Sequence, residues 1–228
     1  MEIRKDTKSN MMKPDQIIRS RRKSIAITVN EQGQLIVRAP LRCDEARILA
    51  FVEKKSEWII KQVARMKDNS ELLPTEDLNG YSFLLKGERI QIIVSDNNRI
   101  FLEGDKLYIP IEAEQKDVAD WLRKQAETVF PETVVRFSKI MECEISSISV
   151  SNARTRWGSC TYDNKIRLAF RLIYTPKEIM EYVVIHELAH TKYKNHGRLF
   201  WNTVERYCPD YKTRRKWLKN HGYFMNIF

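Results

Sequence analysis

Four residues of one short segment have the types and spacing needed to bind a metal ion and activate water. His186 and His190 lie four residues apart, Glu187 lies between them, and His196 follows His190 by six residues. Residues four apart on a helix share one face, so both imidazoles could bind one ion from the same side. A turn after the helix could bring His196 back as a third ligand. The pattern is H-E-x-x-H with a downstream histidine, the zincin signature.

The predicted chemistry is hydrolysis assisted by one zinc ion per chain. Three neutral imidazoles leave Zn²⁺ its full charge and one open position, and the pKa of bound water then falls to about 7. Glu187 would accept a proton from that water and pass it to the leaving group. The fourth histidine, His221, lies in the basic C-terminal region. We expect it to be a surface or packing residue.

Two simpler interpretations stand beside this one. The motif occurs by chance, and a helical histidine is more often a hydrogen-bonded core residue than a ligand. A structural zinc site is the second, but it would normally have a fourth Cys or His ligand, usually in Cys-x-x-Cys spacing. No such pair is present in the chain.

Local signals predict that the two first histidines lie on a capped helix. Thr175 is a good N-cap and Pro176 suits the first helical position. We expect the helix to end near Lys194, because Asn195 and Gly197 both tolerate the left-handed conformation that closes helices. An apolar face should point to a core, and it consists of Ile179, Met180, Val183 and Val184.

The segment of residues 154–160, before this helix, is the second candidate for a functional role. Trp157, Gly158, Ser159 and Cys160 fall in a predicted loop between two strands, where a rigid scaffold could present them to a substrate. Equally, Trp157 could be a core aromatic, Gly158 a turn residue and Cys160 an inert thiol. The strand predicted at residues 165–170 could form the rim of a cleft and pair with an extended peptide.

The donor that would stabilise an oxyanion is not evident from the sequence. Arg171 and Tyr193 are the candidates. Arg171 is also a candidate for substrate binding.

Composition favours a cytoplasmic protein with its own core. The chain has 228 residues, of which 43% are hydrophobic. Its four cysteines are far apart and form no Cys-x-x-Cys pair, which argues against a zinc ribbon or a redox motif and suits reduced thiols. No apolar run approaches the ~18 residues of a membrane span, and the N-terminal segment lacks the apolar region of a signal peptide. The sequence does not indicate an oligomeric state.

The formal net charge of +10 could indicate an anionic partner. Part of the charge lies in two basic clusters, which are Arg19, Arg21, Arg22 and Lys23, and Lys212, Arg214, Arg215, Lys216 and Lys219. These clusters could bind nucleic acid, a phosphorylated substrate or an acidic protein, or they could simply be a solvated surface. No recognition helix, RNP-like aromatic motif or zinc finger accompanies them.

The predicted fold class is α+β. Residues 1–23 should form a basic tail or loop, residues 24–112 a β-rich part with one helix, and residues 113–228 a zincin-like part whose HExxH helix packs on a small antiparallel sheet. The first part should contain a hairpin (24–29 and 35–38, with a turn at 31–33), a helix (44–67, with Met66 in its apolar stripe), and successive antiparallel hairpins (81–85, 89–94, 99–103 and 106–111). The second should contain a long helix (116–142) with a kink or break at Pro131, strands 147–151 and 165–170, the motif helix, a helix at 198–207 and a short helical stretch through Trp217.

At this point the sequence resembles the YgjP-like metal-dependent hydrolases, also described as metallopeptidases. The resemblance rests on Arg156-Trp157-Gly158-Ser159-Cys160, His186-Glu187-Leu188-Ala189-His190, Asn195-His196, Phe200-Trp201 and Pro209-Asp210-Tyr211. The segments Arg22-Lys23-Ser24-Ile25-Ala26-Ile27 and Val37-Arg38-Ala39-Pro40 also look like the opening of the family. It implies a zinc-peptidase-like fold, with His186, His190 and His196 as ligands and Glu187 as the catalytic carboxylate. It also implies that residues 157–160 border the site. The family often has Asn where this chain has Ala169, so any contact made by that Asn is missing here.

The leading hypothesis is a cytosolic zinc metallopeptidase that acts on a peptide or protein substrate. A metal-dependent hydrolase of nucleotide phosphoanhydrides is the first alternative, supported only by the basic charge. A nucleic-acid-binding adaptor with a structural zinc is the second, and it predicts binding that depends steeply on salt and not on Glu187.

Overall fold

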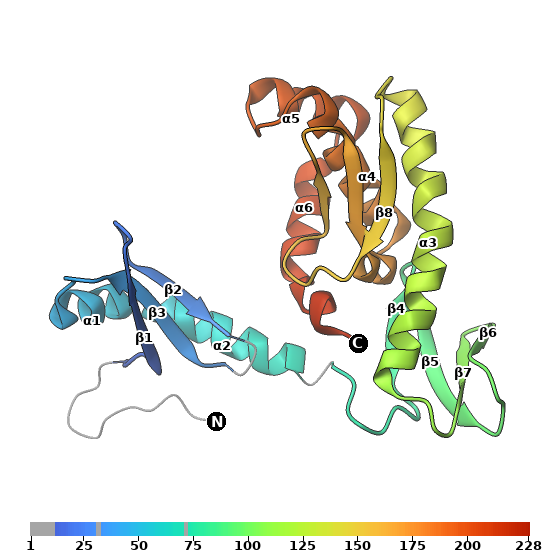
Figure 1. Ribbon diagram of the computed structural model, residues 1–228. Helices are drawn as coiled ribbons and strands as arrows, with labels where there is room; N and C mark the ends of the chain where they lie inside the picture. Colours follow the sequence, from blue (N-terminus) through green and yellow to red (C-terminus); the bar gives the residue numbers. More distant parts are fainter. Residues whose placement is uncertain (1–11, 31–32, 71–72) are drawn as a thin grey trace. The chain divides into compact units, whose positions relative to one another are not determined.

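The chain divides into two compact units, Met1–Leu73 and Pro74–Phe228. The computed structural model describes residues 12–30, 33–70 and 73–228, and describes only the backbone of residues 65–70. Each unit has its own helices and strands (Figure 1). The boundary predicted at residue 112 lies inside the second unit, because the strands before it belong with the C-terminal helices.

The first unit is a three-stranded sheet with two helices. Its elements are β1 (Gln16–Ser20), β2 (Ala26–Val29), β3 (Leu35–Pro40), α1 (Glu45–Lys54) and α2 (Ser56–Ser70). β2 and β3 form the predicted antiparallel hairpin, with Ile27 opposite Val37. Glu31 and Gln32 of the predicted turn lie outside the described residues.

Part of the predicted N-terminal tail is a strand. β1 pairs in parallel with β3, so that β3 is the central strand of the sheet. Asp15 sets this register, because its N–H donates to the Leu35 carbonyl (2.9 Å) and its carboxylate accepts the Leu35 N–H (2.7 Å). Residues 1–11 of the predicted tail lie outside the described residues.

The single helix predicted from Asp44 is two helices. Asp44 caps α1 as predicted, since its carboxylate accepts the Ala46 N–H. Lys55 leaves the helical conformation (φ −109°, ψ 8°), and its N–H bonds to the Val52 carbonyl, which closes α1 before α2 begins. The apolar stripe is confirmed where Ile48, Val52 and Ile59 are fully buried. The side chain of Met66 lies outside the described part.

The second unit begins with a four-stranded sheet. Its strands are β4 (Ser82–Leu85), β5 (Glu88–Ser95), β6 (Phe101–Glu103) and β7 (Lys106–Pro110), in the order β4-β5-β7-β6. Both predicted hairpins, β4–β5 and β6–β7, are confirmed as antiparallel pairs. The strands are not successive, however, because β7 lies between β5 and β6 and pairs in parallel with β5. β7 carries the fully buried Leu107 and Ile109, whereas β6 exposes Leu102, so the more apolar strand is central.

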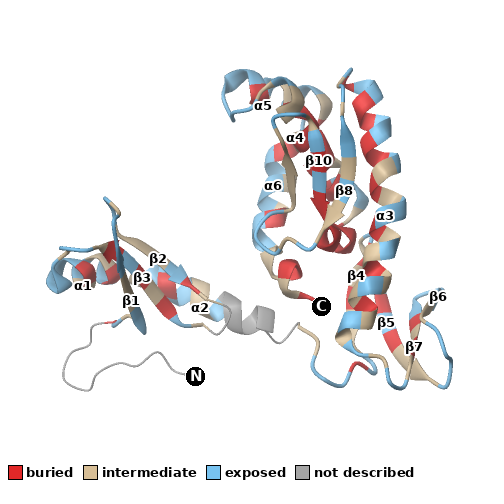
Figure 2. Ribbon diagram, in the orientation of Figure 1, coloured by how far each residue is buried: buried red, intermediate tan, exposed pale blue. Residues whose placement is uncertain are grey.

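The long helix α3 (Gln115–Ile140) continues through Pro131 without a break. A proline inside a helix removes one backbone hydrogen bond and costs about 3 kcal/mol. Burial of Phe130 and Val134 on either side offsets that cost. Buried residues run along α3 over its whole length (Figure 2).

A third sheet lies against the helix that carries the motif. It consists of β8 (Ser147–Ser151), β9 (Gly158–Cys160) and β10 (Lys165–Ala169), in the order β8-β10-β9. β10 is parallel to β8 and antiparallel to β9, so the sheet is mixed rather than antiparallel as predicted. The 3₁₀ helix η1 (Phe170–Tyr174) follows, then α4 (Lys177–Lys192), α5 (Arg198–Tyr207), α6 (Tyr211–Asn220) and the 3₁₀ helix η2 (Gly222–Asn226). α4 contacts β9, α3, α5 and α6.

The β4–β5 hairpin is tied to the start of α4 through η1. The Lys86 N–H donates to the Ile173 carbonyl (2.7 Å), and the Phe83 ring packs edge-on against Tyr174 (centroids 6.0 Å apart). Tyr174 is fully buried. These contacts explain why the sheet of residues 82–110 belongs to the second unit.

Candidate metal centre

α4 begins slightly later than its capping signals predict. Thr175 does not cap it, because its N–H and its hydroxyl both donate to the Leu172 carbonyl (3.1 and 2.8 Å) and so close η1. Pro176 lies just before the first helical residue, and its carbonyl accepts the N–H groups of Ile179 and Met180. The predicted inward face is buried throughout, at Ile179, Met180, Val183 and Val184.

The end of α4 also differs from its prediction. The helix ends at Lys192, and Tyr193 is extended (φ −131°, ψ 102°). Gly197 has φ −74°, and Asn195 is not among the described residues with positive φ, so neither closes the helix in the left-handed conformation. Instead the Asn195 side chain accepts the Gly197 N–H (3.3 Å) in the turn that contains His196.

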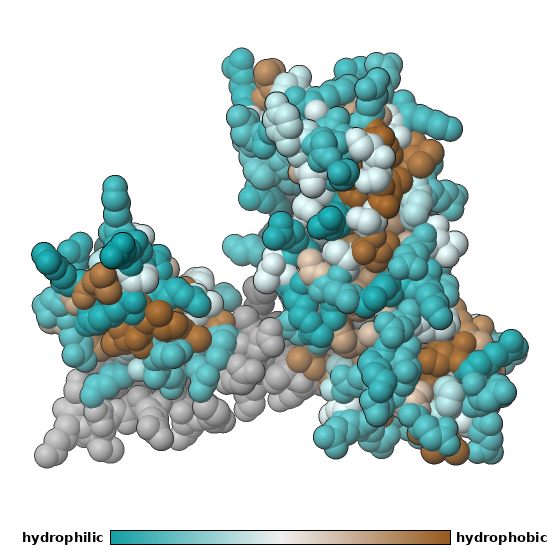
Figure 3. Space-filling model, in the orientation of Figure 1, coloured by the Kyte–Doolittle hydropathy of each residue, from teal (hydrophilic) through white to brown (hydrophobic). Residues whose placement is uncertain are grey.

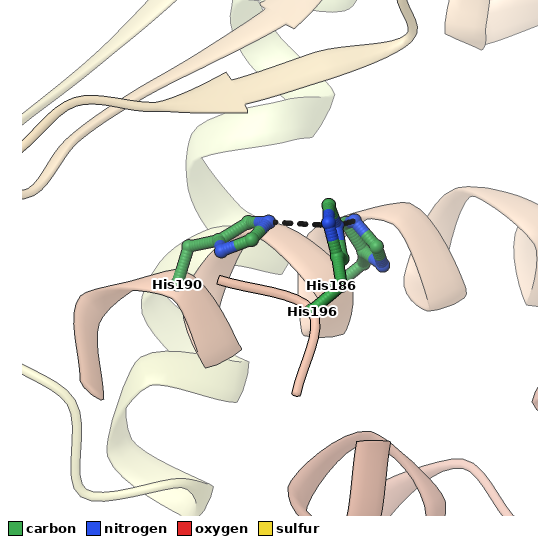
Figure 4. Close-up of side chains that lie close together, drawn as sticks. All are labelled: His186, His190 and His196. Carbon is green, nitrogen blue, oxygen red and sulfur yellow. Dashed lines mark hydrogen bonds between the residues drawn. The ribbon is translucent and has the colours of Figure 1, made fainter. Parts of the chain in front are cut away.

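The three predicted histidine ligands meet at one point. His196 Nε2 lies 3.1 Å from His186 Nε2 and 3.2 Å from His190 Nε2 (Figure 4). The candidate ligand atoms all lie within 4.8 Å of one another. Nitrogen ligands of a tetrahedral zinc, with Zn–N bonds of about 2.0–2.1 Å, lie about 3.3 Å apart. The donor set therefore fits a divalent metal such as zinc.

A backbone carbonyl orients His190. Its Nδ1 lies 3.0 Å from the Tyr193 carbonyl, which can only accept, so Nδ1 carries the hydrogen and the Nε2 lone pair points into the cluster. Second partners of this kind fix the tautomer of histidine ligands. His186 differs, because its Nδ1 is buried without a hydrogen-bond partner in the part of the chain that the structure describes.

Aromatic rings of α5 form the floor of the cluster. The fully buried Phe200 lies against all three imidazoles, with ring centroids 4.5–4.9 Å apart. Trp201 contacts His186 and His196 and also stacks on Tyr211. The floor limits the orientations available to the imidazoles.

Burial keeps two of the imidazoles neutral. Burial, followed by the neighbouring His190 and His196, lowers the pKa of His186 to about 3. Burial is also the main cause that lowers the pKa of His190. Neutral imidazole is the form that binds a metal.

Glu187 lies on the same helix and is buried against β9. A Cβ at Gly158 would lie 2.7 Å from Glu187 Cγ and 2.8 Å from Oε1, so only glycine leaves room for this carboxylate. Burial raises the pKa of Glu187 to about 8, and the charge of Arg156 acts in the opposite direction.

A pocket of about 200 Å³ opens beside Glu187 and His186. Its further lining comes from Trp157, Gly158, Tyr182, Val183 and Leu218. Most of these side chains are apolar, so the pocket suits an apolar side chain. Of the candidate segment 157–160, Trp157 and Gly158 thus lie at the cluster.

The remaining candidates are differently placed. Ser159 lines a separate cavity, and the Cys160 thiol lies 3.4 Å from the Thr161 carbonyl. Burial raises the pKa of this thiol. The Arg171 guanidinium is buried and donates to the carbonyls of Ile227 and Phe228, so it serves the C-terminal residues rather than the histidine cluster. Burial lowers its pKa to about 10.

β9, not β10, offers an edge for an extended peptide. β10 was predicted to form the rim of the cleft, but it is the central strand and pairs on both sides. β9 pairs only with β10 in the described part of the chain. It was not predicted as a strand because Gly-Ser-Cys is too short to show a β pattern.

The two basic clusters lie in different units, and two arginines of the C-terminal cluster contact other residues of the protein. Arg214 donates to Asp210 (2.9 Å) and to the Glu178 carbonyl (2.7 Å), and Arg215 lies over the Trp201 ring.

The His221 ring stacks on Trp217 (centroids 3.8 Å apart), which agrees with the packing role predicted for it. None of the helices in the described ranges has the length and apolar character needed to cross a bilayer.

Comparison with known proteins identifies the family. The family model described as YgjP-like, metallopeptidase domain, matches residues 23–221. The chain belongs to the YgjP-like metallopeptidase family. The match confirms the resemblance drawn from the sequence, and it covers most of both units.

Two solved structures also show local similarity. One is the metallopeptidase zymogen of Pyrococcus abyssi abylysin, 21% identical, covering 39% of this chain and 91% of that chain with a TM-score of 0.36. The other is the metallopeptidase zymogen of Methanocaldococcus jannaschii jannalysin, 22% identical, covering 38% and 93% with a TM-score of 0.34. Comparison with the curated proteins found no significant match.

Proposed function

We propose that this YgjP-like protein is a zinc-dependent peptidase, with His186, His190 and His196 as metal ligands and Glu187 as general base. The convergence of the three Nε2 atoms carries the proposal. Membership of a metallopeptidase family supports it. All four cysteines are free thiols, which supports a reducing compartment such as the cytosol.

When bound, zinc supplies a Lewis acid that polarises a carbonyl and lowers the pKa of a coordinated water to about 7. Residues of the chain orient the imidazoles and transfer the proton. The Tyr193 carbonyl holds His190 in the tautomer that presents Nε2, and Phe200 supports all three rings. Glu187 accepts a proton at its carboxylate and delivers it to the leaving amine.

The surroundings of Glu187 favour a peptide as the substrate. An extended segment could pair with the free edge of β9, where main-chain hydrogen bonds supply affinity and pockets for alternate side chains supply specificity. The pocket lined by Trp157, Val183 and Leu218 would accept an apolar side chain beside the carboxylate. Arg171 is no longer a candidate for the oxyanion donor, because its guanidinium is bound to the C-terminal residues.

Metal content and turnover test the proposal together. We expect about one zinc per chain in native-purified protein and a loss of zinc in His190→Ala. His221→Ala is the matched control, because His221 stacks on Trp217 and is not part of the cluster. Glu187→Gln should retain zinc but lose cleavage of a peptide library that the wild type cleaves.

Two outcomes would contradict the proposal. Full turnover in Glu187→Gln would exclude the carboxylate as general base. A wild-type protein that takes up no zinc, even after zinc is added back, would exclude a zinc-dependent mechanism. Phosphate release from nucleoside triphosphates, measured in the same preparations, would assign the metal to a different reaction.

A further inference from the structure

The two faces of β9 have different surroundings. A Cβ at Gly158 would point at Glu187, so this residue faces α4. Side chains alternate along a strand, and Ser159 therefore points to the opposite face, here called the outer face of the sheet. Arg167 on β10 is the register partner of Ser159, and Ser149 on β8 is the partner of Arg167, so both share the outer face.

A cavity of about 190 Å³ opens on this outer face. Arg156 and Arg167 line it together with the hydroxyls of Ser151 and Ser159, and no acidic residue is among its lining. Gly158 borders both this cavity and the pocket beside Glu187. The two sites thus lie on the two sides of one strand. Figure 3 shows hydrophilic side chains mixed with pale and hydrophobic ones over this part of the second unit.

The two guanidinium groups of the cavity are available to a ligand. Arg156 and Arg167 are both exposed, and neither forms an ion pair or hydrogen bond within the described ranges. The charge of Arg156 also acts on Glu187 across β9, whereas Arg167 has no such effect on that carboxylate. A guanidinium presents paired N–H donors that match a carboxylate, and serine hydroxyls can donate to the same oxygens. The cavity is small, with two cationic groups and no aromatic side chain in its lining. A nucleic acid would instead require a longer basic groove and aromatic platforms for its bases.

We propose that this cavity binds the carboxylate of an acidic side chain in the substrate, so that the protein selects peptides with Asp or Glu near the cleaved bond. The proposal rests on the proposed function, since a peptide paired with the edge of β9 is what would bring side chains here. Along such a peptide, residues i and i+2 point to the outer face and residue i+1 points towards α4. Selection should therefore depend on position with a period of two.

Peptide binding to the Glu187→Gln protein tests this without turnover. The probes are fluorescein-labelled neutral peptides of about ten residues, with Glu, Gln or Lys placed at one position at a time. At one position, or at two positions two residues apart, Glu should bind more tightly than Gln on the order of fivefold, as expected for partly exposed ion pairs. The preference should weaken as salt is raised.

Substitutions at the cavity identify the cationic groups. Arg167→Gln and Arg156→Gln should each reduce the preference for Glu, and Arg167→Glu should reverse it in favour of Lys. Arg89→Gln is the matched control, because Arg89 is an exposed arginine on β5, in a different sheet. The control should bind all peptides as the parent protein does.

Each outcome separates this proposal from the proposed peptidase. Equal binding of Glu and Gln peptides at every position, or a preference that survives both cavity substitutions, overturns the acidic specificity even if wild type cleaves peptides. A preference that depends on Arg167 while wild type cleaves nothing supports the cavity and contradicts the peptidase. Binding of a single-stranded oligonucleotide that is lost in Arg167→Gln, with no effect on the peptides, overturns the proposal in favour of nucleic acid.

Discussion

At residue scale, the position of Glu187 depends on the absence of a side chain at Gly158. The backbone of β9 passes so close to Glu187 that a Cβ would lie within 3 Å of three atoms of its side chain. Such a distance is essentially never seen between a Cβ and a non-bonded heavy atom. In the proposed reaction, Gly158 therefore positions Glu187, in addition to bordering the proposed peptide site on β9.

Gly158→Ala should lower kcat/KM by about a hundredfold, the effect of displacing a reacting group by about 1 Å. Zinc content should stay near that of the wild type, because the contact is with Glu187 and not with an imidazole. The measurement is turnover of any peptide cleaved by the wild type, with metal analysis of the same samples. Ser149→Ala, at an exposed position of β8, is the control. Wild-type turnover in Gly158→Ala would show that the contact does not position the carboxylate.

The convergence of the three histidines could be predicted because it depends mainly on local geometry. His186 and His190 need only a helix between them, and the capped apolar pattern of residues 175–194 predicts one. The Tyr193 carbonyl, the Phe200 ring and the Glu187–Gly158 contact depend on how α5 and β9 pack on α4. No spacing in the sequence encodes that packing. The hydrogen bonds of Arg171 to Ile227 and Phe228 depend on packing in the same way, and the sequence does not predict them.

At the scale of elements, the first turn of α5 supports the cluster built on α4. Phe200 is fully buried, and its ring lies against all three imidazoles. Val204, one turn later, is also fully buried and carries an aliphatic side chain. The same helix thus provides a ring against the three histidines and, one turn later, a buried aliphatic residue.

Phe200→Leu should weaken zinc affinity by about tenfold, at the lower end of the effect of losing an outer-shell support. Val204→Ala is the matched control: it should lower the free energy of unfolding, as large-to-small core substitutions do, and leave zinc affinity unchanged. Chelator competition measures the affinity, and urea denaturation measures the stability. If both variants lose affinity in proportion to their stability, the floor has no specific role.

The β4–β5 turn packs against the start of α4 at a second glycine. Gly87 has φ +87°, and a Cβ there would lie 2.9 Å from Pro176 Cα. Gly104, in the β6–β7 turn, has φ +58° but no atom within 4 Å of a Cβ. Comparison of Gly87 with Gly104 therefore distinguishes the cost of a side chain at positive φ from the cost of a clash between the turn and α4.

Gly104→Ala should cost about 1–2 kcal/mol, the penalty of the left-handed conformation alone. Gly87→Ala should cost more, because the overpacking at Pro176 adds about 1–3 kcal/mol. Urea denaturation of both variants gives the comparison. An equal loss of unfolding free energy in the two variants would mean that the β4–β5 turn can shift away from Pro176 at little cost.

At the scale of the whole molecule, helices and hairpins followed from local patterns, but the division of the chain did not. Capping and apolar periodicity predicted α4, Pro209 marked the end of α5, and glycine-containing turns between short strands predicted the β2–β3, β4–β5 and β6–β7 hairpins. The parallel pairings β1–β3, β5–β7 and β8–β10 join strands that are not neighbours along the chain, and short sequences carry no signal for them. The boundary was predicted at residue 112 because strands precede it and helices follow it. The contacts between the β4–β5 hairpin and η1 place it instead near residue 73.

Two fragments test this division. Residues 74–228 should fold cooperatively and bind zinc with the affinity of the full chain, because the fragment retains every contact described around α4. Residues 113–228 should not, since removal of the β4–β5 hairpin exposes the fully buried Tyr174 and leaves the Ile173 carbonyl without its Lys86 donor. Circular dichroism during thermal unfolding and zinc stoichiometry give the comparison. A 113–228 fragment that folds and binds zinc as well as 74–228 would show that the catalytic part needs no sheet from residues 82–110. Failure of both fragments would instead show that α4 and its zinc ligands require residues 1–73.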